Sequence, residues 1–246
     1  MNQLISDLRN WSKKFLKKFR TIFYYGKSRW CPVCQKYSSK FRDHGLANRK
    51  DVSCIHCGAL ERDRFAWLYL SKKTNIFDSK NKKMLHIAPE MCFKERLKKH
   101  FGNNYLTADL FKPNVMEKMD ITSINYSEES FDIIYCSHVL EHIEDDIKAM
   151  SELYRVLKQN GFALLMVPIL REKTFEDYSI KNPKDRLKVF GQEDHVRIYG
   201  FDFIERLKSV GFEVKMIKPL DIASQEETIL MGLTPASGEI FYCTKN

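Results

Sequence analysis

Four of the seven cysteines occur in two pairs with the spacing of metal ligands. Cys31 and Cys34 form one C-x2-C pair, and Cys54 and Cys57 form another beyond the loop 35–53. Two thiolates on a tight turn supply half of the tetrahedron that Zn²⁺ prefers. Because thiols stay reduced in the cytosol, the spacing predicts a zinc site and not two disulfides. Four thiolates leave no open coordination position, so the predicted zinc is structural.

The second half of the chain carries a different kind of chemistry, with carboxylates and histidines at the ends of apolar segments. Apolar and amphipathic segments alternate from residue 83 onward, which predicts a mostly parallel sheet wound with helices and an antiparallel pair of strands at its edge. The predicted strands are 83–88, 104–110, 130–139, 162–169, 212–218 and 239–244, with a short strand near 118–121. The predicted helices are 61–73, 93–101, 145–158 (closed by Gly161) and 201–210 (ending at Gly211).

The segment 131–169 resembles the central part of class I S-adenosylmethionine-dependent methyltransferases of the ubiquinone-biosynthesis-like kind, also called type 11. The family pattern begins with Phe-Asp, here at 131–132, and continues with Leu-Glu-His, here at 140–142. A helix ending in LKPGG follows in the family, and the corresponding residues here read LKQNG at 157–161. The resemblance covers about residues 83–246, and it implies a Rossmann-like fold and use of S-adenosylmethionine.

The first loop departs from the family pattern. The family has D/E-x-G-x-G-x-G after its first strand, whereas residues 85–90 read LHIAPE and contain no glycine. This loop is similar to that of a branch of bacterial methyltransferases in which cysteine pairs precede the catalytic domain. Glu90 is then expected to bind the amino group of the cofactor.

The resemblance also implies where the cofactor binds. Asp109, at the end of the second strand, is expected to accept hydrogen bonds from both ribose hydroxyls, because a carboxylate offers two acceptor oxygens. Asp120 and Ile121 match the position that contacts adenine, and Ser137 and His138 face the methionine end. The expected cofactor-binding residues are His86, Ala88, Pro89, Glu90, Asp109, Leu110, Asp120, Ile121, Ser137 and His138.

A histidine is the expected general base. Histidine titrates near neutral pH, which suits removal of a proton from an attacking hydroxyl. His195 is the first choice, and an alternative is that His195 and Arg197 only anchor the loop over the cofactor. The expected catalytic residues are His195, Asp194, Arg197 and Glu141.

Positive charge is concentrated at the front of the chain. The segment 1–83 carries a net charge of +14, whereas the segment 84–246 carries −5. Aromatic and aliphatic residues recur at steps of three and four between residues 3 and 23, which predicts a basic amphipathic helix. Such a helix either packs on protein or lies on an anionic membrane surface. A basic N-terminal region is also typical of proteins that bind RNA. A further alternative is that these basic residues only form a solvated surface and bind no partner.

The predicted fold class is therefore α/β: a Rossmann-like doubly wound, mostly parallel sheet with an antiparallel last strand. A small zinc-ribbon-like module and an N-terminal amphipathic helix precede it. The predicted division is 1–29 for the basic helix, 30–82 for the zinc module and linking helix, and 83–246 for the methyltransferase domain. No apolar run approaches the roughly 18 residues that a membrane-spanning helix needs, and the start of the sequence lacks a secretory signal. A cytoplasmic protein is therefore expected. If the N-terminal helix docks on a membrane, the protein is expected to be peripheral to it.

The expected function is S-adenosylmethionine-dependent O-methylation of a small molecule or of a nucleotide- or lipid-linked sugar. One alternative is an RNA methyltransferase that grips RNA with the zinc module and the basic front end. A second alternative is a binding protein whose methyltransferase fold has lost its activity. The sequence leaves the oligomeric state open.

Overall fold

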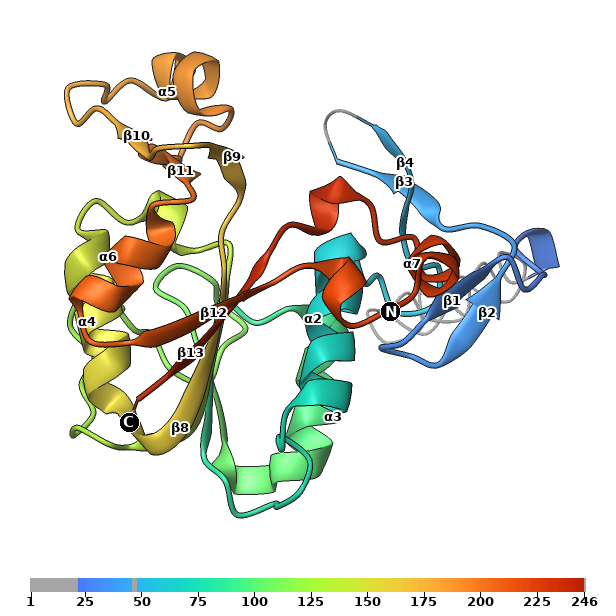
Figure 1. The fold of residues 1–246 in the computed structure, drawn as a ribbon, viewed down its shortest axis with the longest axis horizontal. Coiled ribbons are helices and arrows are strands. Elements are labelled where there is room, and N and C mark those ends of the chain that lie inside the picture. The colour runs from blue at the N-terminus through green and yellow to red at the C-terminus, as the bar shows by residue number, and fades with distance from the viewer. Residues whose placement is uncertain (1–21, 46–47, 246) are drawn as a thin grey trace, which may run out of the picture. The chain divides into compact units, whose positions relative to one another are not determined.

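The computed structural model describes residues 22–45 and 48–245, and these form two compact units (Figure 1). The first unit contains the described part of Met1–Tyr69 together with Ala223–Ser237, and the second contains Leu70–Ile222 together with Gly238–Asn246. The sequence-based division differs from these bounds, because it assigned residues 70–82 to the zinc module and 223–237 to the methyltransferase domain. The predicted amphipathic helix at 3–23 lies almost entirely outside the described residues.

The first unit is built on two short antiparallel hairpins. One pairs β1 with β2, and the other pairs β3 with β4. The buried side chain of Arg64 ties this unit together by donating hydrogen bonds to the carbonyl oxygens of Val52, Ala59, Met231 and Gly232. The elements are β1 (Arg29–Cys31), β2 (Lys36–Ser38), β3 (Arg42–His44), β4 (Arg49–Ser53), α2 (Glu61–Lys73), α7 (Gln225–Met231) and the 3-10 helix Pro235–Ser237. Helix α2 has the predicted bounds, and its last residues belong to the second unit.

The second unit contains a six-stranded sheet in the order β12-β13-β8-β7-β5-β6. The four strands β8, β7, β5 and β6 are parallel, whereas β13 is antiparallel to both of its neighbours. The predicted mixed α/β fold, with a mostly parallel sheet and an antiparallel last strand, is therefore confirmed. The strands are β5 (Met84–Ile87), β6 (Tyr105–Ala108), β7 (Phe131–Ser137), β8 (Leu157–Met166), β12 (Glu213–Ile217) and β13 (Ile240–Thr244).

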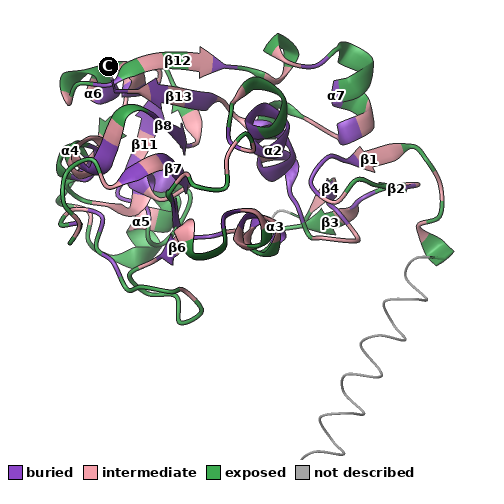
Figure 2. Ribbon diagram, turned by 90° about the horizontal axis from the view of Figure 1, so that it is seen from below, coloured by how far each residue is buried: buried purple, intermediate pink, exposed green. Residues whose placement is uncertain are grey.

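Both faces of the central strands are covered, which explains why their sequences are continuously apolar. In β5, Leu85 and Ile87 join the large core cluster that also holds residues of α4 and α6. Between them, His86 faces the other way and lies against the rings of Phe93 and Tyr135. Figure 2 shows β7, β8 and β13 as largely buried. The helices are α3 (Met91–Phe101), α4 (Asp146–Val156) and α6 (Phe203–Ser209), with 3-10 helices at Gly102–Asn104, Leu140–His142 and Pro219–Asp221.

Two local predictions were wrong. No strand forms at 118–121, where the backbone makes only a single bridge between Ala108 and Glu117. Gly161 does not close a helix, because α4 already ends at Val156 and β8 follows without a loop. Gly161 instead lies within β8, where a Cβ atom would come within 2.8 Å of the Asp132 carbonyl oxygen.

A small sheet and a helix that the sequence did not predict follow β8. The sheet has the order β10-β11-β9, and the helix α5 comes between β10 and β11 (Figure 1). These strands are only two to four residues long, which is too short to show the apolar periodicity from which strands are predicted. Their bounds are β9 (Ile169–Arg171), β10 (Phe175–Glu176), α5 (Pro183–Phe190) and β11 (Arg197–Gly200). No helix within 22–45 and 48–245 is long and apolar enough to cross a membrane.

Candidate active site and metal centre

The two cysteine pairs lie on turns of the same geometry. Cys31 ends β1 and its carbonyl oxygen accepts a hydrogen bond from Gln35, while the carbonyl oxygen of Cys54, after β4, accepts one from Gly58. Gln35 and Gly58 each adopt a positive φ, of 56° and 81°. Each C-x2-C pair thus lies on one tight turn, and the left-handed conformation of Gly58 is one that glycine adopts without strain.

The four cysteine sulfurs fit a tetrahedral zinc ion. All four lie within 4.8 Å of one another, and none forms a disulfide. The Cys31 and Cys57 sulfurs are 3.6 Å apart, and those of Cys34 and Cys54 are 3.7 Å apart. In a tetrahedron with Zn–S bonds of about 2.3 Å, neighbouring sulfurs are about 3.8 Å apart. The two measured sulfur–sulfur distances are close to this value. The neighbouring His56 instead lies 3.1 Å from the Tyr37 carbonyl oxygen, so its ring is not needed as a ligand.

The second candidate site lies at the point in the sheet where successive strands are added on opposite sides of the same strand. The chain adds β6 on one side of β5 and β7 on the other, and ligands of open α/β sheets bind outside the carboxyl ends of strands at such a point. Ala88 follows β5 and His138 follows β7, and both adopt the left-handed conformation, with φ of 49° and 54°. Their amides donate to the carbonyl oxygens of Ala108 and Met166 on the adjacent strands. Ala88 therefore makes a tight turn of the kind that glycine makes in related loops.

Glu90 is held in the first loop by a buried hydrogen-bond relay. The Nε2 atom of His86 is 2.7 Å from Glu90 Oε2, and its Nδ1 atom is 2.7 Å from the Tyr105 hydroxyl. His86 is fully buried, and both of its ring nitrogens have partners within the protein. His86 thus orients the Glu90 carboxylate, and its expected contact with the cofactor stays a prediction.

Asp109 uses one carboxylate oxygen to build its own turn. Its Oδ1 atom accepts hydrogen bonds of 2.8 Å from the amides of Phe111 and Lys112. Its Oδ2 atom lies 3.6 Å from Lys112 Nζ, and the side chain is 11% exposed. The hydroxyls of a ribose would therefore donate hydrogen bonds chiefly to Asp109 Oδ2. Leu110, the next residue of the expected set, is exposed.

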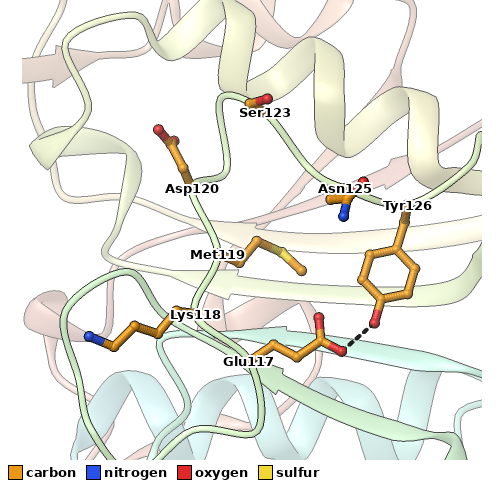
Figure 3. Close-up of a pocket in the computed structure, with 7 residues that line it drawn as sticks. All are labelled: Glu117, Lys118, Met119, Asp120, Ser123, Asn125 and Tyr126. Carbon is orange, nitrogen blue, oxygen red and sulfur yellow. Dashed lines mark hydrogen bonds between the residues drawn. The ribbon is translucent and has the colours of Figure 1, made fainter.

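The expected adenine position borders a pocket, shown in Figure 3. Asp120 lines this pocket and accepts two hydrogen bonds from Thr122, whereas Ile121 is buried in the core. On the far side the Tyr126 hydroxyl donates to Glu117, and burial together with this bond raises the pKa of Tyr126 to about 12. The lining residues are Glu117, Lys118, Met119, Asp120, Ser123, Asn125 and Tyr126.

Histidines and a buried carboxylate gather beyond the end of β7. Glu141 is 1% exposed, and its Oε1 atom lies 3.2 Å from His138 Nδ1. His142 and His195 stack edge to face, with ring centroids 4.6 Å apart. Burial raises the pKa of Glu141, but the bond to His138, the charges of His138 and His142 and a backbone hydrogen bond together make the net shift downward. Burial also lowers the pKa of His195.

Arg197 anchors the turn that carries Glu141. Its guanidinium is fully buried and donates to the carbonyl oxygens of Leu140, Ile143 and Glu144. It also pairs with Glu176 at 2.9 Å. These contacts fit the alternative in which Arg197 anchors the loop, and its predicted catalytic role stays a prediction.

Some residues of the site were not predicted from the sequence. Tyr105 supports His86 from the start of β6, and the Phe190 backbone interacts with the His195 ring. Glu176 and Tyr178 contact Arg197 from the small sheet. Nothing in the local sequence marks these four residues, because their contacts join segments far apart in the chain. Of the other expected residues, Pro89 and Ser137 are buried, and Asp194 lies 3.2 Å from His142.

Comparisons with known proteins agree with this fold. Residues 79–165 match the model of a methyltransferase domain. An S-adenosylmethionine-dependent methyltransferase from Mesorhizobium loti aligns with a TM-score of 0.51 at 14% identity, covering 73% of this chain and 96% of that one. A candidate S-adenosylmethionine-dependent methyltransferase from Listeria monocytogenes aligns with a TM-score of 0.50 at 18% identity, covering 74% and 97%.

Curated sequences match over shorter regions. Sterol 24-C-methyltransferase from Debaryomyces hansenii is 29% identical over 147 residues, which is 58% of this chain and 36% of that protein. An uncharacterized protein from Methanocaldococcus jannaschii is 29% identical over 75 residues, which is 29% of this chain and 33% of that protein. The matched regions thus span about a third of these curated relatives. Residues 79–165 thus match a methyltransferase domain, and the second unit has the fold of S-adenosylmethionine-dependent methyltransferases, as the sequence predicted.

Proposed function

We propose that this protein transfers the methyl group of S-adenosylmethionine to a hydroxyl oxygen of a small-molecule or glycan acceptor. The observation that carries the proposal is the pair of acceptor atoms beyond β7. Glu141 Oε2 and His195 Nε2 are both buried, and neither has a hydrogen-bond partner among the described residues. A neutral hydroxyl must lose its proton as it attacks, and buried acceptor atoms beside the methyl donor suit that task.

The cofactor would lie across the carboxyl ends of β5, β6 and β7. Glu90, which His86 holds, would bind its amino group, and Asp109 Oδ2 would accept a hydrogen bond from a ribose hydroxyl. The bound cofactor would supply the methyl group: the acceptor oxygen would bond to the methyl carbon as the carbon–sulfur bond breaks, with the electron pair left on sulfur. The polar cluster around Glu141 would receive the hydroxyl proton. Holding the two reactants in line accounts for much of the rate in such a displacement.

The Asp109→Asn variant tests the ribose contact. Asparagine keeps the Oδ1 acceptor that the turn amides need and replaces only the second oxygen by an amide. Loss of a charge-assisted hydrogen bond should weaken S-adenosylmethionine binding by about 1.5–3 kcal/mol in calorimetry. Asp177→Asn is the matched control, because Asp177 also accepts from its own turn at Ser179 but lies outside the site. Equal affinity of both variants would place the ribose elsewhere.

The acceptor class is tested with methyl-labelled S-adenosylmethionine. The protein is incubated separately with nucleotide sugars, with a lipid-linked sugar fraction and with total RNA. We expect label in an alkali-stable methyl ether of a sugar fraction. Label that enters no fraction while the cofactor binds would count against the acceptor class.

RNA methylation is the second candidate function. The net charge of +14 over the segment 1–83 favours it, because phosphate contacts by Lys and Arg dominate RNA affinity. Several of the described basic residues are already paired with acids, including Arg29 with Asp51 and Lys50 with Asp43. Label in the RNA fraction, together with binding that falls steeply as salt rises, would favour this function over the first.

A further inference from the structure

Three side chains beyond β7 bring potential metal ligands together outside the cysteine cluster. Glu141, His142 and His195 each offer one ligand atom, and these atoms lie within 4.8 Å of one another. Within this cluster, Glu141 Oε2 and His195 Nε2 are buried and have no hydrogen-bond partner among the described residues. Leaving a buried polar atom unpaired costs about 1–3 kcal/mol, so two such atoms in one cluster indicate a group that satisfies both.

Each of the three side chains is also oriented by an outer partner. The His195 ring interacts with the Phe190 backbone, and its Nε2 atom is buried and has no hydrogen-bond partner among the described residues. In the tautomer protonated at Nδ1, Nε2 offers a lone pair. His142 Nδ1 lies 3.2 Å from Asp194 Oδ2, which leaves its Nε2 atom for a ligand. Metal-binding histidines typically donate their other ring nitrogen to a carboxylate or backbone carbonyl in this way.

The third ligand is oriented in the same manner. Glu141 Oε1 lies 3.2 Å from His138 Nδ1, so the carboxylate is fixed by one oxygen, while the other oxygen is buried and has no hydrogen-bond partner among the described residues. The turn itself is held by Arg197, whose bonds to the Leu140 and Ile143 carbonyl oxygens flank Glu141 and His142. His195 lies between α5 and β11 (Figure 1), so the cluster joins two segments that are far apart in the chain.

We propose that Glu141, His142 and His195 bind a divalent first-row transition-metal ion. Two imidazoles and one carboxylate form a ligand set that such ions favour, and three protein ligands leave coordination positions open. The role of the ion rests on the proposed function. An ion beside the methyl donor would hold the acceptor's hydroxyl oxygen and lower its pKa, so that the proton passes to solvent before the oxygen bonds to the methyl carbon. His195 would then act as a ligand and not as the base.

The test uses Mn²⁺ as the probe and requires neither cofactor nor acceptor. The full chain is dialysed against a weak chelator until one zinc per chain remains, and free Mn²⁺ is then followed by electron paramagnetic resonance. Thiolates discriminate against Mn²⁺, so the cysteine cluster should not compete. We expect one saturable Mn²⁺ site per chain. A titration in which the wild-type chain leaves the free Mn²⁺ signal undiminished would overturn the proposal.

Variants locate the site. Glu141→Gln and His195→Ala should each weaken Mn²⁺ binding by about 100-fold or more, and Asp194→Asn by about 10-fold, the lower end of the usual effect of an outer partner. Glu144→Gln is the matched control, because this carboxylate is 71% exposed and pairs only loosely with Arg186 at 3.6 Å. Affinities equal to the parent in both Glu141→Gln and His195→Ala would overturn the assignment. Circular dichroism of each variant excludes unfolding as the cause.

The outcome separates this inference from the proposed function. Mn²⁺ binding at the site in a chain that fails to bind S-adenosylmethionine would support the metal site and contradict the methyltransferase function. Methyl transfer that persists at full rate after treatment with EDTA would overturn the metal's role and leave the function standing, with His195 Nε2 as the proton acceptor.

Discussion

Replacing Cys54 by serine is expected to release one zinc ion per chain and to unfold the first unit. The unit is small and consists mainly of two short hairpins, so its stability depends on the metal. Zinc binding to such sites contributes about 10–16 kcal/mol, and that binding energy is also folding energy. Elemental analysis of the purified chain gives the zinc content, and limited proteolysis reports on the fold of the unit.

Cys92→Ser is the matched control for this prediction. Cys92 is buried in α3, away from the cluster, so its replacement should leave the zinc content equal to that of the parent. A Cys54→Ser chain that keeps the parental zinc content, or that resists protease as the parent does, would contradict the assignment of the four cysteines to one ion.

Replacing Arg197 by leucine is expected to lower the free energy of unfolding of the second unit by about 3–5 kcal/mol. Glu176 loses an arginine at 2.9 Å but stays paired with Arg206 at 2.8 Å, so the larger part of the loss comes from the turn. The carbonyl oxygens of Leu140, Ile143 and Glu144 each lose a hydrogen bond from the buried guanidinium. The measurement is urea unfolding followed by near-UV circular dichroism.

Arg155→Leu provides the comparison, because Arg155 makes similar bonds in a more exposed place. It pairs with Glu152 at 2.7 Å and donates to the carbonyl oxygens of Tyr126 and Ile124, but its side chain is 35% exposed. An exposed pair contributes about 1 kcal/mol or less, so this variant should lose clearly less stability than Arg197→Leu. Equal losses would show that burial of Arg197 is not what stabilises the turn.

The sequence predicted the parts of the fold that local pattern determines. Continuous apolar runs mark β5, β7 and β8 because both faces of these strands are covered, and the C-x2-C spacing marks the two knuckles because two thiolates need one tight turn. The loop after β5 contains no glycine and was still predicted to bind the cofactor. The left-handed conformation of Ala88 explains how the chain turns there.

Contacts between distant segments could not be predicted in the same way. Histidine and arginine are usually exposed, yet His86 and Arg197 are fully buried, because Tyr105 and Glu176 from other strands satisfy their polar atoms. Likewise, the sequence singled out His195 as a base, but its approach to Glu141 and His142 depends on the small sheet that follows β8. That sheet has no periodic signal of its own.

Calorimetric titration of the folded, zinc-containing chain with S-adenosylmethionine tests the central claim most directly. The account predicts saturable binding of one cofactor per chain, weakened by Asp109→Asn and unchanged by Asp177→Asn. Absence of binding at millimolar cofactor, in protein that retains its zinc and its near-UV spectrum, would contradict the claim that the carboxyl ends of β5, β6 and β7 form a working cofactor site.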